Sequence, residues 1–107
     1  PLLASGDRSE NVAWMVPLDG PLTGELLQVK GKAVIGTAEG CEIRVFDASI
    51  SGRHCEITIG QGGRFRVTDL GSRNGTYVND KTIASVELVD GDNIRLGRTT
   101  FRFKTKN

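Results

Sequence analysis

Apolar and polar residues alternate one by one through several short segments of this chain, and no other feature limits its fold as strongly. The alternation is clearest in HCEITI (residues 54–59), RFRVTDL (64–70) and TTFRFK (99–104). Successive side chains of a β-strand point to opposite faces, so each segment has one apolar face and one polar face. A sheet with one apolar face buries that face against another layer. The sequence therefore predicts two antiparallel sheets packed as a β-sandwich.

Short apolar segments separated by turn residues continue through most of the chain, and none is long and periodic enough for a helix. The segment GQGG (60–63) stands between two alternating segments. It predicts a hairpin loop, because glycine adopts the positive φ angles that such loops need. Nine segments are predicted to be strands: 11–18, 25–29, 32–36, 42–46, 54–59, 64–70, 76–79, 93–97 and 99–104.

Length and charge indicate one domain without a general attraction for polyanions. The 107 residues are 37% hydrophobic and 25% charged, which is ordinary for a globular domain. The formal net charge of +1 gives no extended field for nucleic acid or anionic lipid, so any bound anion must be held locally. No apolar run approaches the roughly 20 residues of a membrane-spanning helix. We expect a soluble, cytoplasmic domain with no nucleic-acid partner and no insertion into a membrane.

The boundaries of the domain are predicted from composition. Residues 1–10 (PLLASGDRSE) are mostly small or polar and lack periodicity, which predicts a flexible tail or linker before a domain at residues 11–107. The sequence begins with Pro1 rather than methionine. We therefore expect it to be a piece of a longer protein.

Few residues of the chain suit catalytic or metal chemistry. Ser51 stands three residues before His54, the single histidine. A nucleophile also needs an orienting acid, an oxyanion site and a pocket, which the sequence does not indicate. One histidine with Cys41 and Cys55 matches no established metal-ligand spacing. We expect both thiols to be reduced apolar fillers, and we expect no enzymatic activity, cofactor or metal.

The segment DLGSRNGTYVN (69–79) concentrates hydrogen-bond donors between two predicted strands. It carries Ser72, Arg73, Asn74 and Thr76, and short polar side chains on a loop make good contacts with anions and peptides. It lacks the lysine of a P-loop and does not open a helix, which argues against a nucleotide site. The same residues also suit an ordinary turn, in which glycine supplies the positive φ and the hydroxyls bind the backbone. Both interpretations are compatible with the pattern.

Four segments together resemble the forkhead-associated (FHA) domain: VIG (34–36), SISGRHCEI (49–57), DLGSRNGTYVN (69–79) and DGDNIRLG (90–97). The resemblance covers residues 12–104, almost all of the chain after the predicted tail. It implies an eleven-stranded antiparallel β-sandwich whose loops at one end bind phosphothreonine in an extended peptide. It also implies a protein–protein interaction module of signalling, with a phosphorylated protein or peptide as its partner.

The resemblance implies roles for individual residues. Ser51 would donate its hydroxyl to the phosphate, Arg73 would contact the phosphate, and Asn74 would hold the main chain of the ligand. Ser72 and Arg53 are further candidate contacts on the same loops. The structural residues of the motif would be Gly36, His54, Gly75 and Thr76, with His54 bracing the binding loops.

One position departs from the family pattern and weakens the expected phosphate site. Family members that bind phosphothreonine usually carry an arginine directly after the glycine of the third strand, where this chain has Thr37. Gly52 likewise replaces an arginine that often follows the binding serine. A phosphate of charge about −2 then loses charge-assisted hydrogen bonds. We expect a cost of about 2–4 kcal/mol, or roughly 30- to 1000-fold in affinity.

Two functional alternatives follow from this departure. In the first, the domain recognises phosphothreonine through a degenerate site, and Arg44, Arg53 and Arg73 converge to supply the charge. Strand alternation directs Arg44 away from the core, however, and a solvated surface charge is the commoner role for such a residue. In the second, the domain keeps the fold and binds an unphosphorylated partner, either by docking within a larger assembly or by reading an acidic residue through the same loops.

Overall fold

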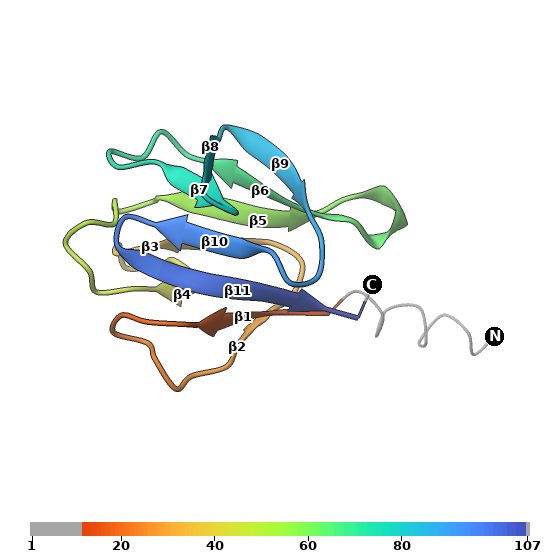
Figure 1. Cartoon of the computed structure of the whole chain (residues 1–107), viewed down its shortest axis with the longest axis horizontal. Coiled ribbons are helices and arrows are strands. Elements are labelled where there is room, and N and C mark those ends of the chain that lie inside the picture. The colour runs from red at the N-terminus through yellow and green to blue at the C-terminus, as the bar shows by residue number, and fades with distance from the viewer. Residues whose placement is uncertain (1–11, 107) are drawn as a thin grey trace.

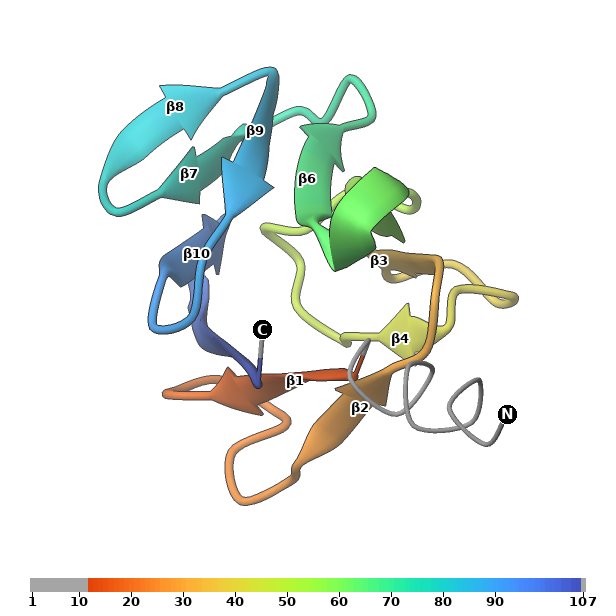
Figure 2. The same ribbon diagram turned by 90° about the vertical axis from the view of Figure 1, so that its right-hand side faces the viewer.

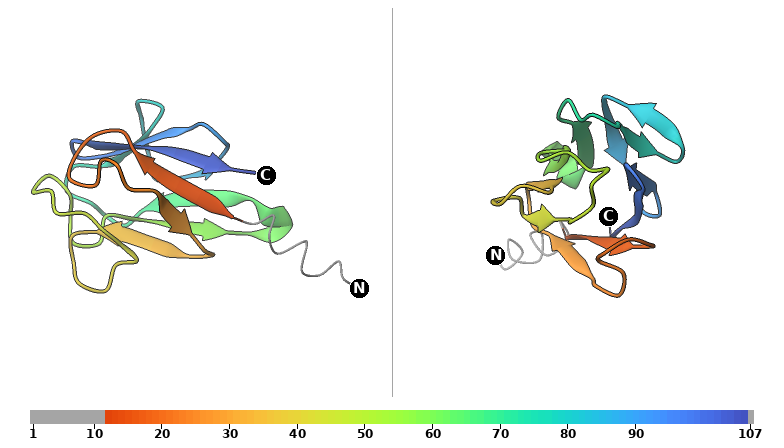
Figure 3. Two further views of the ribbon diagram at one scale, coloured as in Figure 1. Left: turned by 90° about the horizontal axis from the view of Figure 1, so that it is seen from below. Right: turned by 90° about the vertical axis from the view of Figure 1, so that its left-hand side faces the viewer.

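Two β-sheets packed face to face make up the described part of the chain. A computed structural model describes residues 12–106, and the predicted tail at residues 1–10 lies outside this range. Figure 1 shows the strands running along the long axis, and Figure 3 shows the two layers from below and from one end. The β-sandwich predicted from alternation is therefore confirmed.

The strands divide unequally between the two sheets. The larger sheet has the spatial order β2-β1-β11-β10-β7-β8. Its strands are β1 (Ala13–Pro17), β2 (Leu27–Val29), β7 (Thr76–Val78), β8 (Lys81–Ile83), β10 (Asn93–Leu96) and β11 (Thr99–Thr105). The smaller sheet has the order β4-β3-β5-β6-β9. Its strands are β3 (Ala33–Gly36), β4 (Ile43–Arg44), β5 (Cys55–Ile59), β6 (Phe65–Asp69) and β9 (Ser85–Leu88).

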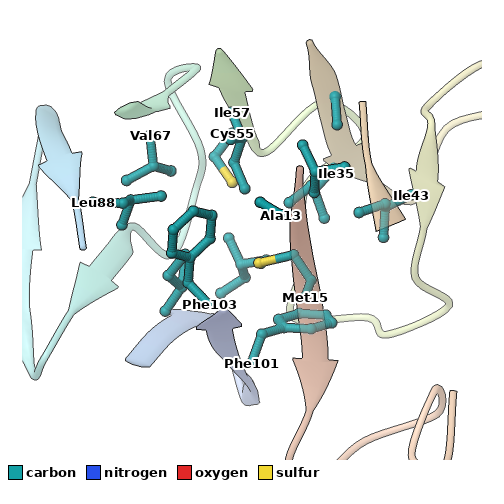
Figure 4. Packing of buried hydrophobic residues seen from close by; sticks show 14 of the residues in the cluster. Ala13, Met15, Ile35, Ile43, Cys55, Ile57, Val67, Leu88, Phe101 and Phe103 are labelled. Carbon is teal, nitrogen blue, oxygen red and sulfur yellow. The ribbon is translucent and has the colours of Figure 1, made fainter. Parts of the chain in front are cut away.

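The core lies between the sheets and is built from alternate residues of each strand. Met15 and Phe103 of the larger sheet meet Ile57 and Val67 of the smaller sheet, and all four are fully buried (Figure 4). Phe65 packs edge-to-face on Phe103, with ring centroids 5.4 Å apart. Burial of a large apolar side chain stabilises the fold by about 1.5–3 kcal/mol. This core holds the strand ends, and hence the loops, in fixed positions.

Two details of the sheets differ from what the sequence predicts. β3 and β4 pair in parallel, with Gly36 opposite Arg44, whereas all the other paired strands among the described residues are antiparallel. Alternation yields nine strands and omits β8 and β9. Both are edge strands with mostly exposed residues, so they lack a clear apolar face. The total of eleven strands implied by the family resemblance is confirmed.

The GQGG segment forms the predicted hairpin loop between β5 and β6. It includes a single 3-10 turn, η1 (Gln61–Gly63), in which Gly62 and Gly63 have φ angles of 76° and 73°. Figure 2 shows this turn in the foreground, at the end of the sandwich where the last strand finishes. The loop therefore lies far from the DLGSRNGTYVN segment, which is at the other end (Figure 1).

The two cysteines have different environments. Both are free thiols, as predicted. Cys55 is fully buried in the core, and this burial raises the pKa of its thiol well above the ordinary value. Cys41 is only partly buried, and its Sγ donates a hydrogen bond to the carbonyl of Gly52 at 3.3 Å. The prediction of two apolar fillers is thus correct for Cys55 and wrong for Cys41, which follows a loop rather than an alternating segment.

Candidate ligand-binding site

Four loops meet at one end of the sandwich, at the left of Figure 1 and facing the viewer in the right panel of Figure 3. They connect β3 to β4 (residues 37–42), β4 to β5 (45–54), β6 to β7 (70–75) and β10 to β11 (97–98). Apart from Arg44, which lies on β4, every residue that the sequence offers as a ligand contact lies on one of the first three loops. The fold therefore brings together positions that are up to 37 residues apart, from Thr37 to Asn74.

His54 joins two of these loops from below. Its side chain is completely buried. Its Nδ1 accepts the backbone N–H of Ser51 at 3.0 Å, and its Nε2 lies 2.8 Å from the carbonyl oxygen of Gly75. A backbone N–H only donates and a carbonyl only accepts, which assigns the ring proton to Nε2. The imidazole thus fixes the β4–β5 loop to the β6–β7 loop.

The carboxylate of Asp69 organises the β6–β7 loop. Its Oδ1 accepts the hydroxyls of Ser72 and Thr76 at 2.6 and 2.7 Å, and its Oδ2 accepts the N–H groups of Gly71 and Ser72 at 3.0 and 3.1 Å. Burial by itself would raise the pKa of Asp69, but the hydrogen bonds outweigh burial and the pKa is lowered. Ser72 Oγ also accepts the N–H of Gly75 at 2.9 Å. The Ser72 hydroxyl therefore donates one hydrogen bond and accepts another within the loop.

Ser51 and Arg73 face each other across the same two loops. Ser51 Oγ accepts the backbone N–H of Arg73 at 2.9 Å. Among residues 12–106, no acceptor takes the proton of the Ser51 hydroxyl, which is partly exposed. The Arg73 guanidinium donates through Nη2 to the carbonyl of Ala48 at 3.1 Å and remains exposed. The Ser51 hydroxyl and the guanidinium of the residue that bonds to it are thus both accessible to solvent.

Asn74 continues this surface and borders a groove. Its Nδ2 donates to the carbonyl of Ser49 at 2.8 Å, and its Oδ1 and second amide proton have no partner among residues 12–106. Arg95 is held at the groove by a hydrogen bond to the Gly97 carbonyl at 2.8 Å and by stacking on the Tyr77 ring at 4.1 Å. The groove has a volume of about 430 Å³ and is lined by Ala48, Ser49, Asn74, Arg95, Gly97 and Arg98. Its lining contains two guanidinium groups and no carboxylate.

A second carboxylate, Asp47, fixes the floor of this groove. Its Oδ1 accepts both the N–H and the hydroxyl of Ser49, at 2.9 and 2.7 Å, and its Oδ2 accepts the Thr99 hydroxyl at 2.6 Å. These bonds, that of Thr99 foremost, lower the pKa of Asp47. Ser49 Oγ also accepts the N–H of Arg98 at 2.9 Å. A Cβ on Gly97 would overlap Ser49, so glycine is required at this turn.

Sequence reasoning does not identify Asp47, Arg95 or Arg98 as part of the site. Arg95 and Arg98 belong to or follow DGDNIRLG, a segment that helps to indicate the family but carries no predicted contact. The strand order places β10 beside β7, and this pairing brings the two arginines to the groove. No local pattern in the sequence reveals that proximity.

Thr37 closes the site on the side of β3. Its N–H donates to the Ser51 carbonyl at 3.1 Å, so the position expected to carry an arginine is adjacent to the binding serine. Gly36 is buried directly beneath the Gly52 carbonyl, where a Cβ would overlap that oxygen. Arg53 is exposed at the margin of the loop. The Val34 N–H donates to Glu42 Oε1 at 2.7 Å, and this hydrogen bond lowers the pKa of Glu42 most.

The described residues hold neither a metal-binding cluster nor a membrane-spanning element. Within residues 12–106, no three His, Cys, Asp or Glu side chains gather in a way that could hold a metal ion. Over the same range, there is no helix with the length and apolar character that a membrane crossing would require.

Comparison with known proteins places this arrangement in a family. The FHA domain model matches residues 33–97. The chain is 41% identical over 94 residues to the glycogen accumulation regulator GarA of Mycolicibacterium smegmatis, covering 87% of this chain. The chain spans 59% of the length of that regulator and 57% of the length of GarA from Mycobacterium tuberculosis.

Solved structures agree with this result. One, from a structural and functional analysis of phosphothreonine-dependent FHA domain interactions, is 33% identical with a TM-score of 0.80, and the match covers 88% of this chain and 96% of that one. A second, the FhaA FHA domain complexed with the intracellular domain of Rv3910, is 34% identical with a TM-score of 0.77, covering 87% and 99%. The fold, the loop geometry and these matches lead to one conclusion: the chain belongs to the FHA domain family.

Proposed function

We propose that this domain is a protein–protein interaction module that binds phosphothreonine in an extended segment of a partner protein. One observation carries the proposal. The Ser51 hydroxyl accepts the Arg73 N–H while its proton has no acceptor among the described residues, and the guanidinium of the same Arg73 is exposed and bonded to the Ala48 carbonyl. A hydroxyl donor next to a fixed cation suits a phosphate group. The likeness to structures of phosphothreonine-dependent FHA interactions supports the same ligand.

The other site residues have separate roles in this proposal. The free Oδ1 and amide proton of Asn74 pair with one N–H and one C=O of the ligand backbone, which fixes an extended peptide over the loop. The groove beside Asn74 takes a neighbouring side chain of the ligand. Ser72 acts within the scaffold, because its single hydroxyl proton is already donated to Asp69 and cannot reach a phosphate. Arg53 contributes at most long-range charge from the margin of the loop.

Thr37 makes the site weaker than a site with arginine at that position, and this observation favours a second candidate function. Thr37 contributes no positive charge beside Ser51. If the phosphate contributes little to the binding affinity, the domain can dock an unphosphorylated segment through the same loops, as part of a larger assembly. The two candidates differ in one measurable property, which is the change in affinity when the ligand threonine is phosphorylated.

The domain acts without catalysis in this proposal. Both nitrogens of His54 bind main-chain groups, so the imidazole cannot remove the proton of the Ser51 hydroxyl. We also assign the domain to the cytoplasm. The two free thiols, of which Cys41 is partly exposed, suit a reducing compartment.

A peptide array tests the proposal directly. Peptides with a fixed central phosphothreonine and randomised flanking positions are probed with the purified domain, beside matched arrays that carry threonine or phosphoserine. We expect binding that depends on phosphothreonine and disappears after phosphatase treatment. Equal binding to the threonine array would instead establish the phosphate-independent docking function.

A further inference from the structure

Arg44 lies directly against the position that lacks the expected arginine. β3 and β4 pair in parallel with Gly36 opposite Arg44, so the Arg44 side chain begins beside the start of the β3–β4 loop. Its Nε donates a hydrogen bond to the carbonyl oxygen of Thr37 at 2.8 Å. The guanidinium that strand alternation directs away from the core is therefore attached to the backbone of the binding loop.

Phe46 holds this guanidinium in place. The guanidinium carbon lies 4.6 Å from the centroid of the Phe46 ring, a distance typical of a cation–π contact. Phe46 is 68% exposed, the highest value among the large hydrophobic side chains of the described residues. Its ring contributes little to the core. The ring instead contacts the Arg44 guanidinium, and this contact restricts the motion of the cation before any ligand arrives.

The charge of Arg44 is not neutralised within the domain. Over residues 12–106, the three ion pairs involve Lys32, Arg64 and Lys104, and none involves Arg44. Only its Nε has a hydrogen-bond acceptor in the same range. Its two terminal nitrogens therefore present four N–H donors and an unpaired charge to the solvent. Such a group is prepared to bind an anion in a bidentate manner.

Thr37 links this cation to the proposed phosphate site. Its carbonyl accepts from Arg44, while its N–H donates to the Ser51 carbonyl at 3.1 Å. The Thr37 backbone thus lies between β4, which carries Arg44, and the loop that carries Ser51. We propose that Arg44 supplies the cation that position 37 lacks, and that it binds the phosphate together with Ser51 and Arg73. This inference rests on the proposed phosphothreonine function.

The test measures the affinity of Arg44→Gln for one phosphothreonine peptide selected from the array, and for its unphosphorylated twin. Loss of a charge-assisted contact predicts affinity for the phosphopeptide that is lower by about tenfold or more. Affinity for the unphosphorylated twin stays unchanged. Arg64→Gln is the matched control, because Arg64 is exposed at the opposite end of the sandwich and pairs with Glu87. The urea midpoints of both variants match that of the wild type, since both side chains are exposed.

A second variant tests whether Arg44 replaces the missing arginine. Thr37→Arg restores a cation at position 37, so it increases phosphopeptide affinity more in the Arg44→Gln background than in the wild type. Equal increases in the two backgrounds would show that the two positions act independently and would overturn the inference.

The outcomes separate this inference from the proposed function. If the wild type binds the phosphopeptide selectively and Arg44→Gln changes that affinity by less than about twofold, the role of Arg44 is rejected and the proposed function stands. Absence of any phosphate-dependent binding by the wild type rejects both. As an independent readout, titration with inorganic phosphate shifts the Arg44 Nε–Hε resonance in the wild type. If saturating phosphate moves the Ser51 amide resonance but not the Arg44 resonance, the bound phosphate lies out of reach of Arg44, and the inference is overturned.

Discussion

Ser51 Oγ accepts the backbone N–H of Arg73 at 2.9 Å, which joins two loops that are 22 residues apart in the sequence. This bond uses an oxygen lone pair, and the hydroxyl proton has no acceptor among residues 12–106. It also fixes the start of the Arg73 side chain, whose guanidinium then reaches the Ala48 carbonyl. The site is therefore formed before a ligand binds, which lowers the entropic cost of binding.

The buried imidazole beneath this pair provides the first prediction. In His54→Ala, the Ser51 N–H and the Gly75 carbonyl lose their partner and a cavity is left. We expect the free energy of unfolding to fall by about 3 kcal/mol, measured by urea denaturation. Gln61→Ala, at an exposed position of the distal turn, is the control and changes stability by less than about 0.5 kcal/mol. A loss below about 1 kcal/mol for His54→Ala would contradict the bracing role.

Alanine substitutions at Gly36 and at a control glycine test the close approach of β3 to the β4–β5 loop. Gly36→Ala adds a Cβ that overlaps the Gly52 carbonyl, so the β4–β5 loop must shift. We expect a loss of about 2 kcal/mol in stability and weaker peptide binding. Gly60→Ala is the matched control, because its backbone angles are ordinary and its added Cβ meets nothing closer than 3.9 Å. Equal stability of the two variants in thermal unfolding would show that the contact at Gly36 is unimportant.

Asp69 predicts how stability depends on pH. Its pKa is lowered in the folded state, so the unfolded chain binds more protons in acid. The Asp69 carboxylate contributes fully to the stability of the fold above a pH of about 4, the ordinary pKa of an aspartate. This contribution is lost as the pH falls through the lower pKa of Asp69 in the folded state. We expect Asp69→Asn to be less stable by about 2 kcal/mol at neutral pH. The difference narrows as the pH is lowered toward 3.

Urea denaturation of both proteins at a series of pH values measures this difference. Glu39→Gln removes an exposed carboxylate that has no hydrogen-bond partner in the described part of the chain, and it serves as the control. A stability difference between Asp69→Asn and the wild type that stays constant from pH 7 to about pH 3 would contradict the assignment.

The groove beside Asn74 predicts part of the sequence preference. Arg95 and Arg98 line it without a carboxylate, so an acidic ligand side chain is favoured there. Arg98 is exposed and its side chain has no hydrogen-bond partner over residues 12–106, which makes it the residue to change. We expect Arg98→Glu to lose the preference for acidic peptides on the array, because the introduced carboxylate offsets the charge of Arg95. An unchanged profile would show that the ligand does not enter the groove.

Much of the fold can be predicted because its cause is local. Alternation in the segment that contains Phe101 and Phe103 directs both rings inward regardless of the rest of the chain, and the structure buries both. Alternation does not predict the edge strands β8 and β9, because few of their residues are buried. The parallel pairing of β4 is likewise set by packing between distant segments.

The candidate site also has residues that the sequence predicts and contacts that only the fold determines. The residues Ser51, Arg73 and Asn74 stand in short motifs whose spacing is visible in the sequence. The engagement of Ser72 by Asp69 could not be predicted, because a donor in a loop can equally face inward or outward. The contact between Arg44 and Thr37 depends on strand register. Alternation shows only that Arg44 leaves the core, and the structure shows where it goes.

Calorimetric titration of the wild-type domain with one matched peptide pair tests the central claim most directly. The pair consists of the tightest phosphothreonine peptide from the array and its unphosphorylated twin. We predict that phosphorylation tightens binding by at least about tenfold, and that Ser51→Ala and Asn74→Ala each remove most of this gain. Equal affinity for the two peptides, or a phosphate-dependent gain that survives in Ser51→Ala, would contradict the account.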